Sequence, residues 1–301
     1  MRVLAVDIGT NSTLHLIADV AGNNLMLIER GISGNKLGVG LAADRRIPPD
    51  IRELNRRLLD DIVRRAAELG CRRMAAVGTQ ALREAVNRDE LLDYARELGL
   101  EIRILTPAAE ALLGWRGVFS PQGTHRPTVL LDLGGGSCQL TTGRGAEPGE
   151  SFSIPLGAVT LTRKFFASDP PDAGEEAAAR QAVANALQGQ RVREGAETQV
   201  VGIGGTITAL AALELKLVDY EPGALEGEIL TSSGVIQWRE RLMAMGQEER
   251  ERLPGMPPAR AHSIHGGALI LEQIMQLWGW EQVMVSERGV MFGLAYEMFQ
   301  P

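Results

Sequence analysis

The chain has 301 residues, of which 45% are apolar and 23% charged, as in ordinary globular proteins, and this length suits two domains. Its net charge of −7 and its pI of about 5.3 disfavour binding to nucleic acid or to a membrane surface. The sequence has two cysteines, no signal-peptide pattern and no apolar run long enough to span a membrane, which predicts a cytoplasmic protein without disulfides.

The chain opens with a predicted hairpin around a glycine turn. Residues 3–8 and 13–20 read as its two strands, and residues 24–31 read as a third strand. The first strand ends in Asp7, and a tight turn there leaves backbone N–H groups uncovered beside the carboxylate. Such a turn suits a phosphate group and a divalent cation. The turn consists of Gly9, Thr10, Asn11 and Ser12.

Helices and short strands alternate in the next hundred residues. The apolar spacing predicts a helix over residues 51–69 that ends at Gly70, and a buried strand over residues 74–77. Asn87 followed by Glu90 reads as a capping box for a helix that ends near Gly99. After a strand over residues 102–105, Thr106 and Pro107 are typical of a helix start.

The glycine turn then occurs a second time. Residues 129–140 repeat the pattern of an apolar run, an aspartate (Asp132), a hydrophobic residue and a glycine turn closing on serine. This duplication predicts two related halves that face one phosphate-filled cleft. The second turn consists of Gly134, Gly135, Gly136 and Ser137.

The composition places a domain boundary just before this second turn. Residues 120–127 read as a linker. We therefore predict a first domain over residues 1–121 and a second over residues 122–287, with a C-terminal helix at 288–301 that packs back onto the first. In the second domain, a strand over residues 198–203 runs into a helix and forms a further anion site. Its residues are Gly204, Gly205 and Thr206.

A long helix is predicted over residues 260–277, ending at Trp278 and Gly279. His262 and His265 lie one turn apart on it, but no third ligand is evident, so we expect no zinc site there.

Six motifs in this order resemble the exopolyphosphatase / guanosine pentaphosphate phosphohydrolase family. They are D-I-G-T-N-S (7–12), G-T-Q-A-L-R-E-A-V-N (78–87), P-A-A-E-A (107–111), D-L-G-G-G-S (132–137), S-I-P-L-G-A-V-T-L-T (153–162) and G-I-G-G-T (202–206). The resemblance implies an α/β fold of two ribonuclease-H-like (actin-like) domains, each with a mixed five-stranded sheet flanked by helices, around an interdomain cleft. It points to the short, two-domain class of the family.

The resemblance also implies a role for individual residues. It makes Arg83 a phosphate clamp, Glu110 the base that activates water, and the two glycine turns phosphate loops. It places Mg²⁺ (or Mn²⁺) in the region of Asp7, Asp132 and Gln139, and it makes Asp132 a catalytic residue that helps hold magnesium or the attacking water. The implied activity is release of terminal orthophosphate from inorganic polyphosphate, or conversion of guanosine pentaphosphate to tetraphosphate.

Each of these roles has a structural alternative. Glu110 would also stabilise the start of its own helix without any catalytic task. Arg83 would also form a surface ion pair with Glu84 or Glu90. Asp7 and Asp132 would also cap their own turns, and the double glycine at 204–205 would also serve as a strand–helix connection.

The sequence departs from the family pattern at three places. Ala109 stands where the family usually has a first glutamate of a pair, Gln139 stands where it has glutamate, and Met291-Phe292 stands where an Arg-Glu pair is common. Two other functions therefore stay open: an actin-like kinase or ATPase, and a non-catalytic sensor that binds polyphosphate or alarmone nucleotides. The oligomeric state stays open as well, with a homodimer among the alternatives.

Overall fold

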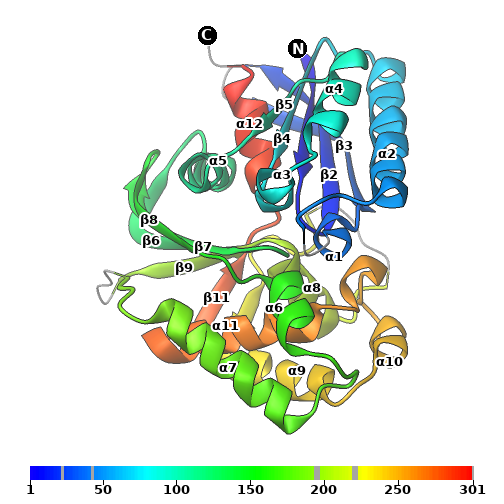
Figure 1. Cartoon of the computed structure of the whole chain (residues 1–301). Coiled ribbons are helices and arrows are strands. Elements are labelled where there is room, and N and C mark those ends of the chain that lie inside the picture. The colour runs from blue at the N-terminus through cyan, green and yellow to red at the C-terminus, as the bar shows by residue number, and fades with distance from the viewer. Residues whose placement is uncertain (22–23, 42–43, 193–196, 219–222, 300–301) are drawn as a thin grey trace. The chain divides into compact units, whose positions relative to one another are not determined.

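The computed structural model describes residues 1–21, 24–41, 44–192, 197–218 and 223–299 (Figure 1). The chain divides into two compact units. Unit 1 comprises Met1–Gly123 and Arg288–Pro301, and unit 2 comprises Thr124–Glu287. Among the described residues, no helix combines the length and the apolar character needed to cross a bilayer.

Unit 1 is built on a mixed sheet of five strands in the order β3-β2-β1-β4-β5. The first three strands form an antiparallel meander, and the last two run parallel to β1. This five-stranded sheet is the one predicted for the first domain. Its strands are β1 (Arg2–Ile8), β2 (Ser12–Ala21), β3 (Asn24–Gly34), β4 (Arg73–Gly78) and β5 (Ile102–Ile104).

Helices cover both faces of this sheet because alternate residues of β1 point to opposite sides. Leu4 and Val6 belong to one apolar cluster, together with residues of α2 and α4, and Val3 and Ala5 belong to another, together with α5 and α12. The helices of unit 1 are α1 (Leu37–Gly40), α2 (Pro49–Glu68), α3 (Gln80–Glu84), α4 (Asp89–Glu97), α5 (Pro107–Phe119) and α12 (Val290–Glu297).

Unit 2 repeats the strand pattern of unit 1. Three antiparallel strands are followed by two strands parallel to the first, in the order β8-β7-β6-β9-β11. The prediction of five strands is wrong for this sheet, because a sixth short strand, β10, pairs antiparallel with β11. The strands are β6 (Thr124–Leu133), β7 (Cys138–Gly145), β8 (Pro148–Ile154), β9 (Gln199–Ile203), β10 (Ile229–Thr231) and β11 (Gln282–Val285).

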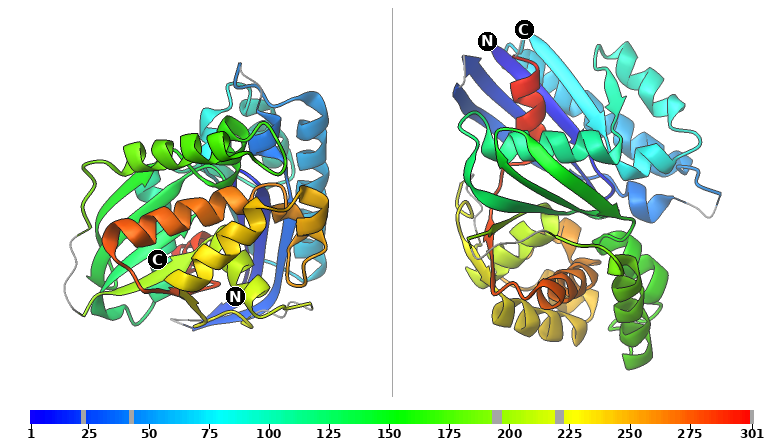
Figure 2. Two further views of the ribbon diagram at one scale, coloured as in Figure 1. Left: turned by 90° about the horizontal axis from the view of Figure 1, so that it is seen from below. Right: turned by 90° about the vertical axis from the view of Figure 1, so that its left-hand side faces the viewer.

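The core of unit 2 is built around α11, most of whose residues are buried. This helix lies between α7 and α9 (Figure 2). The helices of unit 2 are α6 (Ala158–Phe165), α7 (Ala173–Leu187), α8 (Gly205–Glu214), α9 (Ser232–Met243), α10 (Gln247–Glu251) and α11 (Ile264–Trp278), with a 3-10 turn at Pro258–Arg260.

Several local predictions are confirmed and others are wrong. Gly70 and Gly279 follow their helices with positive φ, as expected of helix ends. The helix predicted from residue 260 begins only at Ile264, because the proline-rich segment before it forms a 3-10 turn. The predicted linker already belongs to β6 from Thr124 onward. Asn87 caps no helix, because its side-chain oxygen accepts from the Ile47 N–H at 2.8 Å.

Candidate functional site

The two glycine turns, here called loop 1 (residues 9–12) and loop 2 (residues 134–137), close in the same way. The N–H of Gly9 donates to the Ser12 carbonyl at 2.9 Å, and the N–H of Gly134 donates to the Ser137 carbonyl at 3.1 Å. Each loop joins the first and second strand of its sheet. The duplication read from the sequence is therefore a duplication of backbone geometry.

The carbonyl groups of loop 1 are held by the segment that follows β3. The Gly9 carbonyl accepts from the Asn35 side chain at 2.8 Å, and the Asn11 carbonyl accepts from the Asn35 N–H at 3.1 Å. The Thr10 carbonyl accepts from the Gly38 N–H at 2.6 Å. Asn35 is fully buried, so this support is part of the core of unit 1.

The carbonyl groups of loop 2 are held by the N-terminus of α6. Its first N–H groups donate to the Gly134 and Gly135 carbonyls at 2.8 to 3.1 Å, and the Thr160 hydroxyl donates to the Gly136 carbonyl at 2.9 Å. Gly157 allows this approach, because a Cβ there would lie 2.6 Å from the Gly134 carbonyl oxygen. The N-terminus of α6 therefore packs directly against the backbone of loop 2.

This arrangement leaves donors available in loop 2. Within the described parts of the chain, the N–H groups of Gly135, Gly136 and Ser137 donate to no acceptor. Successive N–H groups in a tight turn form a concave site for an anion. Loop 2 is therefore suited to hold phosphate oxygens.

In unit 1, the carboxyl ends of three parallel strands meet at one edge of the sheet. The Thr79 N–H donates to the Ile8 carbonyl at 3.1 Å, and the Leu105 N–H donates to the Gly78 carbonyl at 2.9 Å. Loop 1 follows β1, α3 follows β4, and α5 follows β5. Parallel sheets bind their ligands beyond this edge.

This edge brings Arg83 of α3 and Glu110 of α5 together. The Arg83 guanidinium lies 3.4 Å from a Glu110 carboxylate oxygen and also donates to the Leu105 carbonyl. Glu110 is only 7% exposed, and a buried carboxylate needs such a partner. The ion pairs of Arg83 with Glu84 or Glu90, considered from the sequence, do not form, since each of these glutamates bonds to another residue.

The start of α5 is as predicted, and it fixes where Glu110 stands. The Thr106 hydroxyl accepts from the Ala109 N–H at 3.2 Å, and Pro107 is the first helical residue. Glu110 therefore lies in the first turn. Ala109 instead packs against an apolar cluster of unit 1, which also contains Met291 and Phe292. Ala109 and the pair Met291-Phe292, which depart from the family pattern, are therefore part of the apolar core of unit 1.

In unit 2, Asp132 lies directly opposite Gln139 on the β6–β7 ladder. Side chains at opposed positions share one face of a sheet and lie close together. Gln139 is 3% exposed, and among the described residues its side-chain oxygen has no hydrogen-bond donor. The corresponding aspartate of unit 1, Asp7, lies opposite Leu14.

Gly204 connects β9 to α8 with a φ of 92°. A Cβ there would lie 2.8 Å from a carboxylate oxygen of Asp132 and 2.7 Å from the Leu133 carbonyl oxygen. Glycine therefore lets the Asp132 carboxylate lie against the start of α8. The predicted strand–glycine–helix element is present, and its N-terminus adds a positive dipole end to the surroundings of Asp132.

Three helix N-termini meet in this part of unit 2. Loop 2 is in contact with the start of α6, and a Cβ at Gly267, in the first turn of α11, would contact both Thr206 of α8 and Ala158 of α6. Each N-terminus carries a partial positive charge. Together they make the end of β6 favourable for anionic ligands.

Arg260 is a candidate site residue that the sequence pattern did not indicate. Its guanidinium lies so close to Gly205 that a Cβ there would overlap it, and the side chain is 7% exposed. Burial lowers the pKa of Arg260 to about 10, so the group still carries its charge at neutral pH. The sequence placed this arginine inside a regular helix, which concealed its position at a turn.

His265, the second of the two histidines of this segment, behaves as a structural group. His265 is 2% exposed and stacks on Phe166, and burial lowers its pKa to about 3. Across the part of the chain that the structure describes, no group of three or more His, Cys, Asp or Glu residues is arranged to hold a metal ion.

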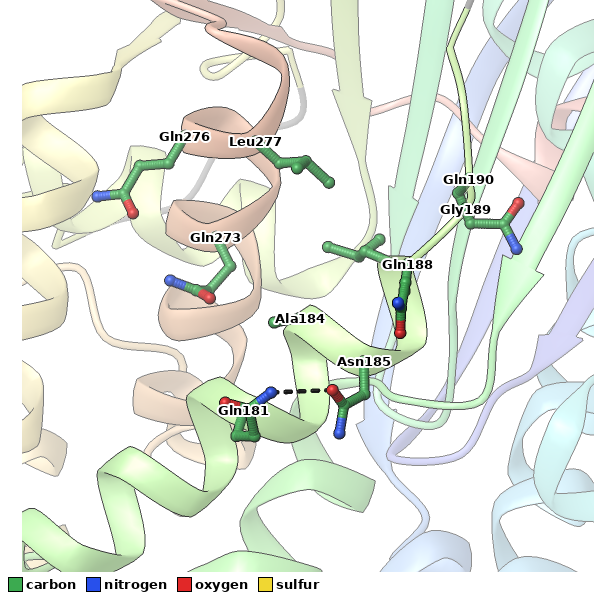
Figure 3. Close-up of a pocket in the computed structure, with 10 residues that line it drawn as sticks. Gln181, Ala184, Asn185, Gln188, Gly189, Gln190, Gln273, Gln276 and Leu277 are labelled. Atoms are coloured by element: carbon green, nitrogen blue, oxygen red, sulfur yellow. Dashed lines mark hydrogen bonds between the residues drawn. The ribbon is translucent and has the colours of Figure 1, made fainter.

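A separate groove of about 620 Å³ lies between α7 and α11 (Figure 3). Carboxamide side chains line it, and Gln181 donates to Asn185 at 2.9 Å. None of its lining residues carries a charge and none belongs to the predicted site. This groove is therefore not suited to a polyanion.

The chain matches the Ppx/GppA phosphatase family over residues 16–300. Exopolyphosphatase 2 of Mycobacterium tuberculosis is 32% identical to it, and the alignment covers 99% of this chain and 98% of the relative. The Aquifex aeolicus PPX-GPPA enzyme is 30% identical, with a TM-score of 0.81 and 99% of each chain covered. An exopolyphosphatase from Cytophaga hutchinsonii, at 23% identity, shares the fold with a TM-score of 0.87 over 99% of this chain and 97% of its own.

Proposed function

This chain belongs to the Ppx/GppA phosphatase family and with it to the hydrolases of phosphoric anhydrides, and on this premise we propose that it releases terminal orthophosphate from inorganic polyphosphate. The similarity to an exopolyphosphatase over nearly the whole chain supports this substrate. The observation that carries the proposal is the duplicated loop, closed by the same hydrogen bond in both units. A polyphosphate offers each loop a row of identical phosphate groups.

Glu110 acts as the general base in this proposal. A water molecule attacks the terminal phosphorus, Glu110 takes the proton of that water, and the bond from phosphorus to the bridging oxygen breaks. The products are orthophosphate and a chain shortened by one unit. The Arg83 guanidinium, 3.4 Å from Glu110, holds the base in place and binds a phosphate oxygen.

Loop 2, the start of α8 and the Arg260 guanidinium bind the phosphate groups in unit 2. Each supplies donors or positive charge that is fixed before the substrate arrives, which stabilises the negative charge of the transition state. Loop 1 supplies the same kind of cradle in unit 1.

The residues of unit 2 fit a magnesium ion. Mg²⁺ prefers hard oxygen ligands and usually keeps several waters, with one or two carboxylates and the substrate phosphates completing its shell. Asp132 supplies a carboxylate, and the buried Gln139 side chain supplies an oxygen that has no donor among the described residues. When bound there, the ion would neutralise the charge of the leaving phosphate chain.

Guanosine pentaphosphate is the second substrate of this proposal, because it ends in the same kind of phosphoric anhydride. Orthophosphate release from polyphosphates of defined length, from guanosine pentaphosphate and from ATP, each with Mg²⁺ or Mn²⁺, tests both substrates. Release from polyphosphate without any acceptor molecule supports the hydrolase. Turnover of ATP only in the presence of an acceptor would instead indicate a kinase, and binding without release under any metal would indicate a sensor.

A further inference from the structure

Arg250 is the most deeply buried arginine of the described residues, with an exposed fraction of 1%. Its guanidinium donates to three backbone carbonyls: to Ala261 at 2.7 Å, to Met245 at 2.7 Å and to Leu242 at 3.2 Å. A fourth hydrogen bond, of 2.6 Å, goes to the Asp169 carboxylate. All these partners belong to unit 2.

Asp169 completes this arrangement. One of its oxygens accepts from Arg250, and the other accepts from the Gln247 N–H at 2.7 Å, at the first residue of α10. The carboxylate therefore neutralises the buried charge and joins it to a helix start. The guanidinium and the carboxylate together join the end of α9, the start of α10 and the turn before α11.

Ala261 is the residue that follows Arg260. Its carbonyl is fixed by Arg250, so the backbone is held immediately beyond the arginine whose guanidinium lies against Gly205. We propose that Arg250 is a positioning residue, which holds Arg260 over the N-terminus of α8 so that its guanidinium meets a phosphate group. This inference rests on the phosphate-binding role proposed above for Arg260.

A purely structural role would not require this chemistry. Burying a charged guanidinium is costly even though its partner, the Asp169 carboxylate, is 43% exposed, and apolar side chains of similar volume often stabilise a core better. Polar groups that are fully bonded do fix one backbone arrangement. A phosphate site that needs the charged side chain of Arg260 in one position benefits from a backbone that is fixed beside it.

Unit 2 contains a matched control for the loss of a partly buried arginine. Arg239 is bonded to Glu272 at 2.8 Å and to Glu176 at 3.4 Å, and its side chain is 12% exposed. These contacts link α9 to α11 and α7, and none reaches the turn at 258–261. Both R250K and R239K keep the charge while removing a planar set of donors.

The test measures binding of inorganic orthophosphate to the full chain by calorimetry, alongside the thermal midpoint of unfolding. We expect R250K to weaken orthophosphate binding about tenfold, because an ammonium group has three donors at a single nitrogen and cannot replace all four hydrogen bonds of the planar guanidinium. R239K should lower the thermal midpoint of unfolding by about as much as R250K does. It should change the affinity for orthophosphate by less than about twofold. Equal affinities for R250K and wild type would overturn the proposal. If R250K does not fold, D169N, which keeps an acceptor for Arg250, replaces it with the same expectation of weaker binding.

A double-mutant cycle tests whether Arg250 acts through Arg260. In an R260Q background, R250K should weaken orthophosphate binding no further, since the group that it positions is gone. Independent effects of the two substitutions would overturn the proposal, as would an R260Q protein that binds like wild type. Orthophosphate binding needs no turnover, so a wild type that releases nothing from polyphosphate refutes the proposed function while the cycle still decides this inference.

Discussion

The two glycine loops share their closure and differ in what surrounds them. Loop 1 is held by Asn35 and lies at the sheet edge where Arg83 meets Glu110. Loop 2 is held by the start of α6, beside the start of α8 and the buried Arg260. The duplicated fold thus supplies the same backbone cradle twice. The chemistry comes from side chains and helix ends that are specific to each unit.

The two units also differ in the residue that lies opposite the aspartate of each first strand. Asp7 faces leucine across its ladder, whereas Asp132 faces Gln139. The Leu14 side chain has no oxygen to offer a cation, and the Gln139 side chain has one that is buried and has no donor among the described residues. This difference is our reason for placing the proposed magnesium ion in unit 2.

The strongest test of the assignment for unit 1 is Glu110→Gln. The change keeps the shape of the side chain and removes its basicity, so turnover should fall by about two to four orders of magnitude. Substrate binding and the unfolding midpoint should stay close to wild type. Rates of orthophosphate release under saturating substrate measure the effect. If turnover by the Glu110→Gln protein stayed within a few-fold of wild type, Glu110 would not be the base and would only stabilise the start of its helix.

The strongest test for unit 2 is Gly157→Ala. The added Cβ would lie 2.6 Å from the Gly134 carbonyl oxygen, so loop 2 must move. We expect KM for polyphosphate to rise by at least about tenfold, with a loss of stability of about 1 to 3 kcal/mol.

Gly117→Ala is the control for this overpacking. A Cβ at Gly117 would overlap the Gly289 carbonyl in the contact between α5 and α12 of unit 1, and the atoms nearest to it belong to neither loop. It should cost similar stability and leave KM close to that of wild type. An equal rise of KM in both variants would show that loop 2 has no special role in binding.

Arg83→Ala tests the pairing of base and clamp in unit 1. Loss of the guanidinium should weaken binding of every phosphate substrate by about tenfold, and lysine should restore it only in part. Arg52→Ala removes another ion pair of unit 1, with Glu90, and should leave binding unchanged. A variant that loses thermal stability but keeps its affinity for substrate would assign Arg83 to structure alone.

Features that depend on residues adjacent in the chain could be predicted from the sequence, and the two loops are the clearest example. Both loops were predicted because an aspartate, a hydrophobic residue and a glycine turn are adjacent in the chain. The helix start at Thr106 and Pro107, and the helix ends at Gly70 and Gly279, follow from local backbone preferences and are confirmed.

The pair of Arg83 and Glu110 depends instead on the order of strands in the sheet. The two residues are brought together only because β4 and β5 are neighbours. The position of Arg260 was concealed because the apolar spacing of α11 continues in the sequence through a turn that proline creates. The strand β10 has three residues, too few for a periodic signal, and Asn87 bonds to a partner 40 residues away.

We expect a smaller effect from a change at Gln139, the residue opposite Asp132. Leucine stands opposite the corresponding aspartate of unit 1. If the Gln139 oxygen faces the magnesium ion, Gln139→Glu adds a full negative charge beside Asp132. Two carboxylates in contact repel one another without a cation and bind Mg²⁺ more tightly than one carboxylate and one amide. The magnesium concentration for half-maximal activity should then fall by about three- to tenfold.

A measurement without turnover makes this prediction independent of catalysis. The Gln139→Glu protein should be less stable than wild type in the absence of magnesium, and its unfolding midpoint should rise more than that of wild type as magnesium is added. Gln181→Glu makes the same change of charge in the carboxamide groove, whose lining includes neither Asp132 nor loop 2, and should respond to magnesium as wild type does. Because the amide of Gln139 lies on the same face of the sheet as Asp132, superimposable magnesium titrations of Gln139→Glu and wild type would mean that no cation binds between them. The assignment of the metal to unit 2 would then be wrong.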